Sequence, residues 1–173
     1  MQAIELLRSA MNVAHQSHEA TVADVTPEMA HWRPPGQAHP IGSLYAHMVV
    51  GEDTLVNAVL QGGAPLYAGP WAGRTGLAQP SAAFSRTVEQ AREMRVELPK
   101  VRAYAQAVYA ASDAFLASLD DAALDRVVDF TQFDMGTMTL GDALANLVLG
   151  HVRDIMGEIS ALKGVQGAKG YPF

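Results

Sequence analysis

The amino-acid sequence predicts an all-α protein, a four-helix bundle with a short extra helix and long loops. Four long stretches repeat apolar residues at the spacing of one helix face, Pro and Gly residues separate these stretches, and no strand is convincingly indicated. The chain has 173 residues, of which 49% are hydrophobic and 17% charged, which is enough for one domain with a sizeable core. We therefore predict a single helical-bundle domain over residues 1–173.

The first two predicted helices carry histidines on or beside their apolar stripes. The first helix starts near the N-terminus, includes His15 and His18 in its stripe, and ends at Thr26-Pro27. Pro40 opens the second helix, because proline favours the first helical turn. Gly62-Gly63 then stand where a helix stop is expected.

The middle of the chain is less regular. A loop rich in Gly and Pro reaches about Pro80, and a shorter, more polar helix is predicted over residues 81–97. Pro99 starts the third main helix. Residues 120–138 are ambiguous, since residues 127–130 fit either a short extended piece or a loop.

The last helix is predicted to begin after Thr139. This residue has the side chain of an N-cap, and Asp142 follows three residues later in a position like that of a capping box. The helix is expected to run to about Lys163 and to stop at Gly164.

Composition excludes several classes of function. The formal net charge is −6 and no basic run is present, so we expect neither nucleic acid nor an anionic membrane surface as a partner. The chain has no cysteine, which excludes disulfides, thiolate ligands and a cysteine nucleophile. The N-terminus lacks the pattern of a signal peptide and no apolar stretch is long enough to span a bilayer. These features predict a cytoplasmic protein.

Ionisable residues on the inward stripes point to a polar site inside the bundle. Helical geometry places His151, Asp154 and Glu158 on the core face of the last helix. Glu52 lies among the apolar residues of the second helix, and His47 lies at the edge of that face. Because burying such groups without partners is costly, we expect them to meet between the helices.

Two stretches of the sequence resemble the DinB-like superfamily of four-helix bundles. The first is residues 41–47 (IGSLYAH) with residues 51–53 (GED), preceded by the connection at residues 32–36 (WRPPG). The second is residues 150–159 (GHVRDIMGEI) with residues 162–164 (LKG) in the last helix. The order and the length of the helices agree with this family over nearly the whole chain. The resemblance therefore implies the same bundle fold.

The resemblance also implies a place for a metal. The family typically binds a divalent ion, such as zinc or nickel, through one histidine of the second helix and two of the last. His47 and His151 match two of these positions, and the third falls on Ile155, which cannot bind a metal. Members include enzymes that act with low-molecular-weight thiols, and they are often homodimers, so a homodimer is expected here.

The third ligand position has several alternative occupants. Glu52, Asp154, Glu158 or His18 is possible on helical geometry, although none has the family's spacing. Glu158 is equally interpreted as a hydrogen-bond acceptor that orients a histidine, and the two matched histidines as core residues that each make one hydrogen bond.

Two functions follow as alternatives. The first is a divalent-metal-dependent S-transferase or hydrolase of the thiol-dependent type, with His47 and His151 as ligands and with Glu52 or Glu158 as the proton acceptor. The second is a metal-free binding or stress-associated bundle, in which the site is a polar pocket between the helices or only a structural remnant. The isoleucine at position 155 favours the second, and the two retained histidines favour chemistry of some kind in the pocket.

Overall fold

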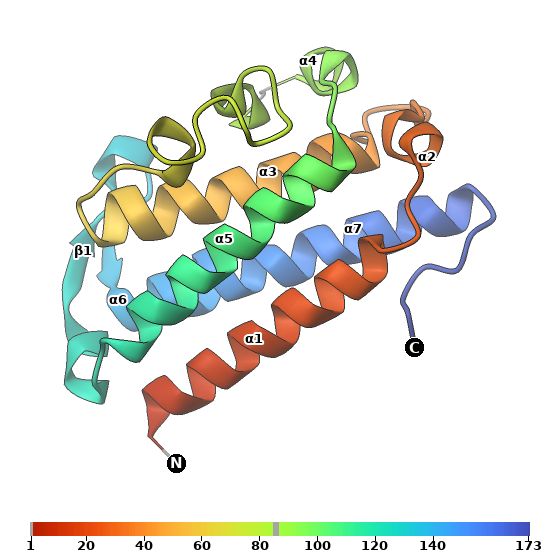
Figure 1. Ribbon diagram of the computed structural model, residues 1–173. Helices are drawn as coiled ribbons and strands as arrows, with labels where there is room; N and C mark the ends of the chain where they lie inside the picture. Colours follow the sequence, from red (N-terminus) through yellow and green to blue (C-terminus); the bar gives the residue numbers. More distant parts are fainter. Residues whose placement is uncertain (1, 85–86) are drawn as a thin grey trace.

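Four long helices form the molecule in the computed structural model, which describes residues 2–84 and 87–173 (Figure 1). They are α1 (Ala3–Val22), α3 (Ile41–Asp53), α5 (Leu98–Ala117) and α7 (His151–Val165). α3 continues into the π-helical segment η1 (Thr54–Leu60), and α7 is preceded by α6 (Leu140–Asp142) and by a second π-helical segment, η6 (Ala143–Gly150). The predicted all-α fold is confirmed.

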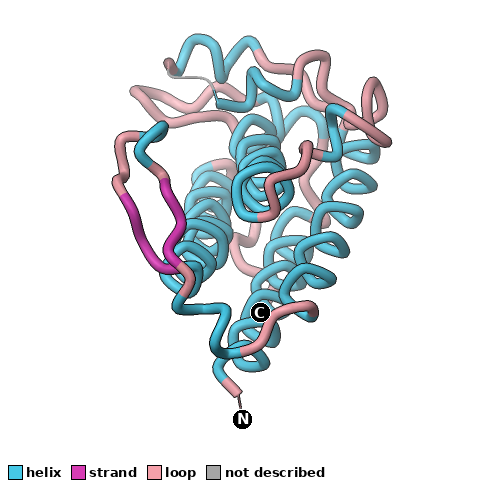
Figure 2. Tube along the Cα trace, turned by 90° about the vertical axis from the view of Figure 1, so that its left-hand side faces the viewer, coloured by secondary structure: helices cyan, strands magenta, loops and turns pink. Residues whose placement is uncertain are grey.

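The packing of the four helices is that of a bundle. α1 lies against α5 and α7, and α3 lies against the same two helices. The view turned by 90° shows these helices grouped together, with the two short strands on one side of the group (Figure 2). Each helix therefore buries its apolar stripe against two neighbours.

Shorter elements connect the main helices. They are α2 (Pro27–His31), η2 (Leu66–Ala68), η3 (Pro80–Phe84), α4 (Val88–Glu93), η4 (Asp121–Asp125), β1 (Val127–Asp129), η5 (Thr131–Phe133) and β2 (Thr137–Thr139). β1 and β2 form an antiparallel hairpin in which Val128 pairs with Met138. This hairpin settles the ambiguity of residues 120–138. Phe130, which follows β1, is fully buried and fixes the hairpin to the bundle.

The predicted extent of the short helix, residues 81–97, is wrong. A 3₁₀ turn, Pro80–Phe84, comes first, residues 85–86 lie outside the described residues, and α4 ends at Glu93. Beyond α4 the chain is extended, because Val96 pairs with Leu77 and the Glu97 N–H donates to the Gly76 carbonyl at 3.0 Å. A tertiary pairing therefore takes the last residues of this stretch out of the helix.

Both ends of the last helix can be compared with the sequence. Thr139 is its N-cap, as predicted, because its hydroxyl accepts from the Asp142 N–H at 3.0 Å and donates to the Asp142 carboxylate at 2.8 Å. The predicted stop at Gly164 is wrong, since the helix reaches Val165. Gly167, with φ of 81°, takes the left-handed conformation that follows a helix end.

A polar layer crosses the bundle where its apolar core divides in two. One apolar cluster includes Val50, Tyr109 and Val152, and the other includes Val56, Leu116 and Val148. His15, Glu52 and Ser112 lie buried near the boundary between the clusters. We call these three residues the polar layer.

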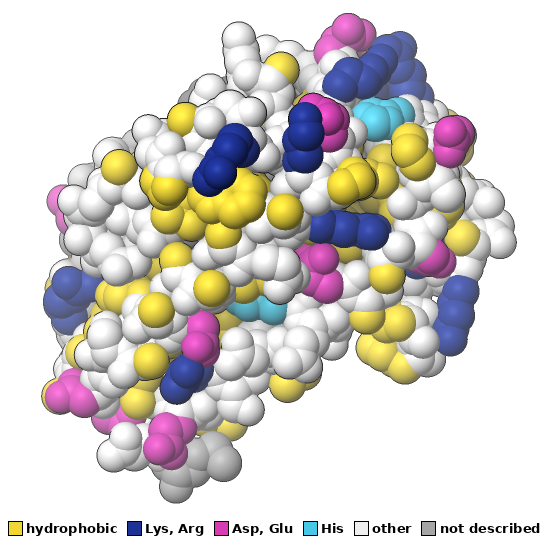
Figure 3. Space-filling model, in the orientation of Figure 1, with side chains coloured by type: hydrophobic (Ala, Val, Ile, Leu, Met, Phe, Trp, Pro, Cys, Tyr) yellow, Lys and Arg dark blue, Asp and Glu magenta, His cyan; other side chains and the backbone are white. Residues whose placement is uncertain are grey.

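The outer surface carries mixed charge. On the face drawn in Figure 3, basic and acidic side chains are interspersed and form no continuous patch of one sign. In the described part of the chain, no helix is both long and apolar enough to cross a membrane.

Candidate functional site

The structure brings His47 of α3 and His151 of α7 together. Their ring centroids lie 4.9 Å apart and the rings are nearly perpendicular, with an interplanar angle of 88°. Gly51 lies one turn after His47, and a Cβ atom added there would come 3.4 Å from Cε1 of His151. Because residue 51 is a glycine, no side chain of this residue occupies the space beside the His151 ring.

A backbone carbonyl in η3 fixes the orientation of the His47 ring. Nδ1 of His47 lies 2.9 Å from the carbonyl oxygen of Ala83, and a carbonyl only accepts, so Nδ1 donates. In the neutral ring, Nε2 then keeps a free lone pair. Phe84 meets the same imidazole edge to face, with centroids 6.0 Å apart.

His151 is held in its neutral form at neutral pH. Burial, together with the neighbouring His47, lowers the pKa of His151 from 6.5 to about 4, and the charges of Asp154 and Glu52 oppose this shift. A neutral imidazole has one donor and one acceptor nitrogen. His151 is thus an uncharged, polar group at neutral pH rather than a cationic one.

The histidine pair lines a cavity of about 680 Å³. We call it the α3–α7 cavity, and its described lining is His47, Gly51, Thr54, Leu55, Val59, Phe84, Phe130, Phe133, Met135, Asn146, Leu147, His151 and Asp154. Side chains of both π-helical segments, η1 and η6, line it. π-helical turns are often found at functional sites, so the local helix geometry supports a role for this cavity.

A larger hollow lies beside this cavity and shares Phe84 with it. It has a volume of about 890 Å³ and is lined by residues between Leu77 and Phe84 and by α4 and its flanks, including Glu89, Glu93 and Arg95. None of the histidines lines it among the described residues. The α3–α7 cavity is therefore the better candidate, because residues of both sequence motifs converge in it.

Glu52 is buried as predicted but is not among the described residues that line the cavity. Its carboxylate accepts from Nε2 of His15 at 2.9 Å and from the Ser112 hydroxyl at 2.6 Å. It is 2% exposed. Glu52 therefore belongs to the polar layer and is already hydrogen-bonded at both oxygens.

The prediction that Asp154 and Glu158 share the core face of the last helix is wrong. Both side chains are exposed, and Val152, Ile155 and Ile159 fill the inward face of α7. The prediction assumed an uninterrupted α-helix, but η6 makes i→i+5 hydrogen bonds and shifts the phase of the residues after it. Asp154 still reaches the edge of the cavity, whereas Glu158 does not line it.

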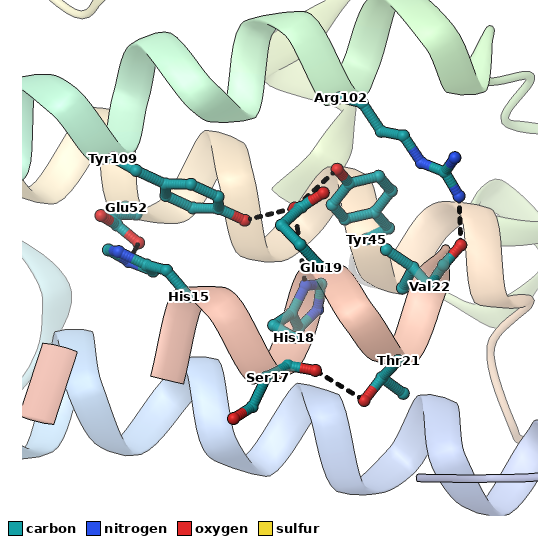
Figure 4. A network of polar contacts seen from close by, with 10 residues as sticks. All are labelled: His15, Ser17, His18, Glu19, Thr21, Val22, Tyr45, Glu52, Arg102 and Tyr109. Carbon is teal, nitrogen blue, oxygen red and sulfur yellow. Dashed lines mark hydrogen bonds and ion pairs between the residues drawn. The ribbon is translucent and has the colours of Figure 1, made fainter. Parts of the chain in front are cut away.

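A second group of polar side chains, which includes His18, lies deep between α1, α3 and α5 (Figure 4). Glu19 accepts from the hydroxyls of Tyr45 and Tyr109 at 2.9 and 2.8 Å. Burial raises the pKa of Glu19, but these hydroxyls and nearby His18 outweigh it and bring the pKa below its usual range. His18 is fully buried and contacts Tyr45, with ring centroids 5.4 Å apart.

Sequence reasoning missed Glu19. A signal was present, because Glu19 follows His15 by one helical turn and so shares its face of α1. Its partners Tyr45 and Tyr109 come from other helices, and only the packing of the bundle brings them within reach.

The residues present do not fit the three-histidine metal site of the resemblance. His47 and His151 meet, but Ile155 is 5% exposed and packs in the apolar core. Among the described residues, no group of three or more histidine, aspartate or glutamate side chains is placed to hold a metal ion. His18 and Glu52 are engaged in the buried polar groups instead.

Comparisons with known proteins agree with the fold. The sequence profile described as the DinB superfamily matches residues 11–158. No curated protein matches the chain. A conserved protein of Enterococcus faecalis, known from its crystal structure, is 21% identical with a TM-score of 0.78, and the match covers 96% of this chain and 99% of that one. Because the family profile covers most of the sequence, this chain belongs to the DinB superfamily.

Proposed function

We propose that the protein binds a small, mostly apolar molecule in the α3–α7 cavity. The observation that carries this proposal is a cavity of about 680 Å³ whose lining is mostly apolar and includes the His47–His151 pair. Ligand sites in proteins have volumes of about 300–1,000 Å³ and combine apolar walls with a few polar groups that converge. The cavity has both properties.

The family's metal-dependent chemistry is the second candidate, and the donor set supports it less well. In its favour, the Ala83 carbonyl holds His47 so that Nε2 keeps its lone pair, as the outer partners of metal ligands do. Against it, zinc sites in proteins use at least three protein ligands, and Ile155 occupies the third position. A thiol-dependent transferase or hydrolase activity is therefore not the function that we favour.

Dye binding tests the first proposal. Nile red is neutral, apolar and small enough for the cavity, so its fluorescence should rise on binding to the protein. Leu55→Trp fills the cavity from η1 and should weaken binding at least tenfold. Leu6→Trp is the matched control, because Leu6 is 58% exposed on α1 and does not line the cavity. Equal binding by the parent and Leu55→Trp would contradict the proposal.

Metal content separates the two candidates. The untagged protein, incubated with zinc or nickel and then freed of unbound ion, should hold far less than one ion per chain by elemental mass spectrometry. His151→Ala should then leave the metal content unchanged. Near-stoichiometric metal that is lost in His151→Ala would favour the metal-dependent enzyme instead.

A further inference from the structure

The two histidines lie toward one end of the α3–α7 cavity, and the other end is mostly apolar, with Thr54 and Asn146 as its polar side chains. Along α3 and η1, His47 comes first, and Leu55 and Val59 follow by about two and three turns. On the opposite side, His151 meets His47, and Leu147 lies one turn before it. A ligand with an apolar body is therefore expected to place its polar head against the two histidines.

The polar end offers more hydrogen-bond acceptors than donors, because the neutral His151 ring supplies one of each and its two neighbours supply acceptors. His47 already donates from Nδ1 to the Ala83 carbonyl, so Nε2 of the neutral ring accepts only. Within the described residues, the ring nitrogens of His151 make no hydrogen bond to another side chain or to the backbone. Asp154 also lines this part of the cavity. An ionised carboxylate can accept hydrogen bonds but cannot donate them.

Charge at this end disfavours an anion. Among the lining residues that the structure describes, none is lysine or arginine, and Asp154 contributes a negative charge. The net charge of the whole chain is −6. Burying a ligand carboxylate here would leave it without a cationic partner, which is costly.

The excess of acceptors at the polar end and the lack of a cation among the described lining residues together favour one ligand class. We propose that the cavity selects uncharged molecules with an apolar body and a hydrogen-bond-donating head, namely alcohols or phenols, over carboxylates of similar size. This inference rests on the proposed function, because it names the ligand class of the same cavity. The hydroxyl of the ligand donates to Nε2 of His47, and the body packs against Leu55, Val59 and Leu147.

Three probes with a similar body test the head group. They are 4-ethylphenol, which donates, 4-ethylanisole, whose methyl ether cannot donate, and 4-ethylbenzoate, which is an anion at pH 7.5. Dissociation constants are measured by competition with Nile red and confirmed by ligand-observed NMR. We expect 4-ethylphenol to bind about tenfold more tightly than 4-ethylanisole, the ratio for one good hydrogen bond, and 4-ethylbenzoate to bind most weakly.

Variants locate the acceptor. In His47→Phe, the constants for 4-ethylphenol and 4-ethylanisole should agree within about twofold, because the hydroxyl has lost its acceptor. His39→Phe is the matched control, since His39 does not line the cavity, and it should keep the parent's ratio. Helix content by circular dichroism checks that each variant folds, and the parent's own three constants test the proposal without any variant.

The outcomes distinguish a failure of the head-group preference from a failure of the proposed function. Equal binding of phenol and anisole by the parent, or tighter binding of the benzoate, would overturn the head-group preference and leave the apolar cavity standing. An unchanged ratio in a folded His47→Phe would also overturn it. Failure of all three probes, together with failure of Nile red, would overturn the proposed function itself.

Discussion

The imidazole of His15 stacks on the ring of Tyr109, with centroids 3.9 Å apart and an interplanar angle of 17°. This contact joins two polar groups in the bundle interior. His15 donates to Glu52, and Tyr109 donates to Glu19. The two carboxylates are thus linked across α1, α3 and α5 through one stacked pair of rings (Figure 4).

Removing Glu52 should destabilise the fold. Glu52→Ala leaves His15 and Ser112 buried without their acceptor, so the free energy of unfolding should fall by about 2–4 kcal/mol. Urea unfolding measures the change. Glu158→Ala is the control, because Glu158 is exposed on α7, and its effect should stay within about 0.5 kcal/mol. Equal losses in both variants would contradict the assignment of Glu52 to the polar layer.

Acidification should charge His151 at the expense of stability. Its pKa is about 4 in the folded chain and about 6.5 in an unfolded one, so the unfolded state binds more protons between these values. The free energy of unfolding should therefore fall as the pH drops from about 6.5 to 4, by about 1–3 kcal/mol from this residue. NMR titration of the His151 ring gives its pKa directly.

A variant isolates this contribution from that of the carboxylates. His151→Leu has no group that titrates at this position, so its stability should fall less steeply than the parent's between pH 6.5 and 5. Urea unfolding at several pH values makes the comparison. An NMR pKa for His151 near 6.5 would contradict burial as the main influence on this ring.

Side chains of increasing size at position 51 test the contact between this residue and the His151 ring. Gly51→Ala places Cβ 3.4 Å from Cε1 of His151, which is an ordinary contact. The variant should bind Nile red as the parent does, and it should be more stable by about 0.5–1 kcal/mol because alanine favours the helix. Gly51→Val adds two methyl groups beside the ring and should displace it, with at least a fivefold loss of dye affinity. Equal affinities in both variants would contradict the predicted contact.

Lys163 should hold the end of α1 against α7. It is 2% exposed, and its ammonium donates to the Thr21 carbonyl at 2.7 Å and to Asp24 at 2.5 Å. Lys163→Met leaves this carbonyl without its donor and should lower the melting temperature. The free energy of unfolding should fall by about 1–3 kcal/mol. Lys100→Met is the control at an exposed ion pair with Glu97, and it should change stability by less than about 1 kcal/mol.

Local signals in the sequence were enough to predict most of the bundle. The apolar stripe of α1, the proline before α3 and the N-cap Thr139 each depend on residues close in the chain, and the structure has all three. The short extension at Val96 was missed because its partner, Leu77, lies far away in the sequence.

The candidate site could be predicted only in part. His47 and His151 were placed together from two motifs, and the structure brings them into contact. Asp154 and Glu158 were assigned to the wrong face because helical periodicity does not reveal where a π-helical segment shifts the phase. Whether His47 and His151 bind a metal stays a prediction, as do the homodimer and the cytoplasmic location.

The polar layer also has a consequence for how the helices align during folding. Apolar stripes tolerate sliding, since one leucine contact resembles another. A slip of α1 by one turn would displace His15 by about 5.4 Å relative to Glu52. Both buried groups would then be unpaired. The His15–Glu52–Ser112 contacts therefore favour a single axial register of α1, α3 and α5 among those that the apolar residues alone would allow.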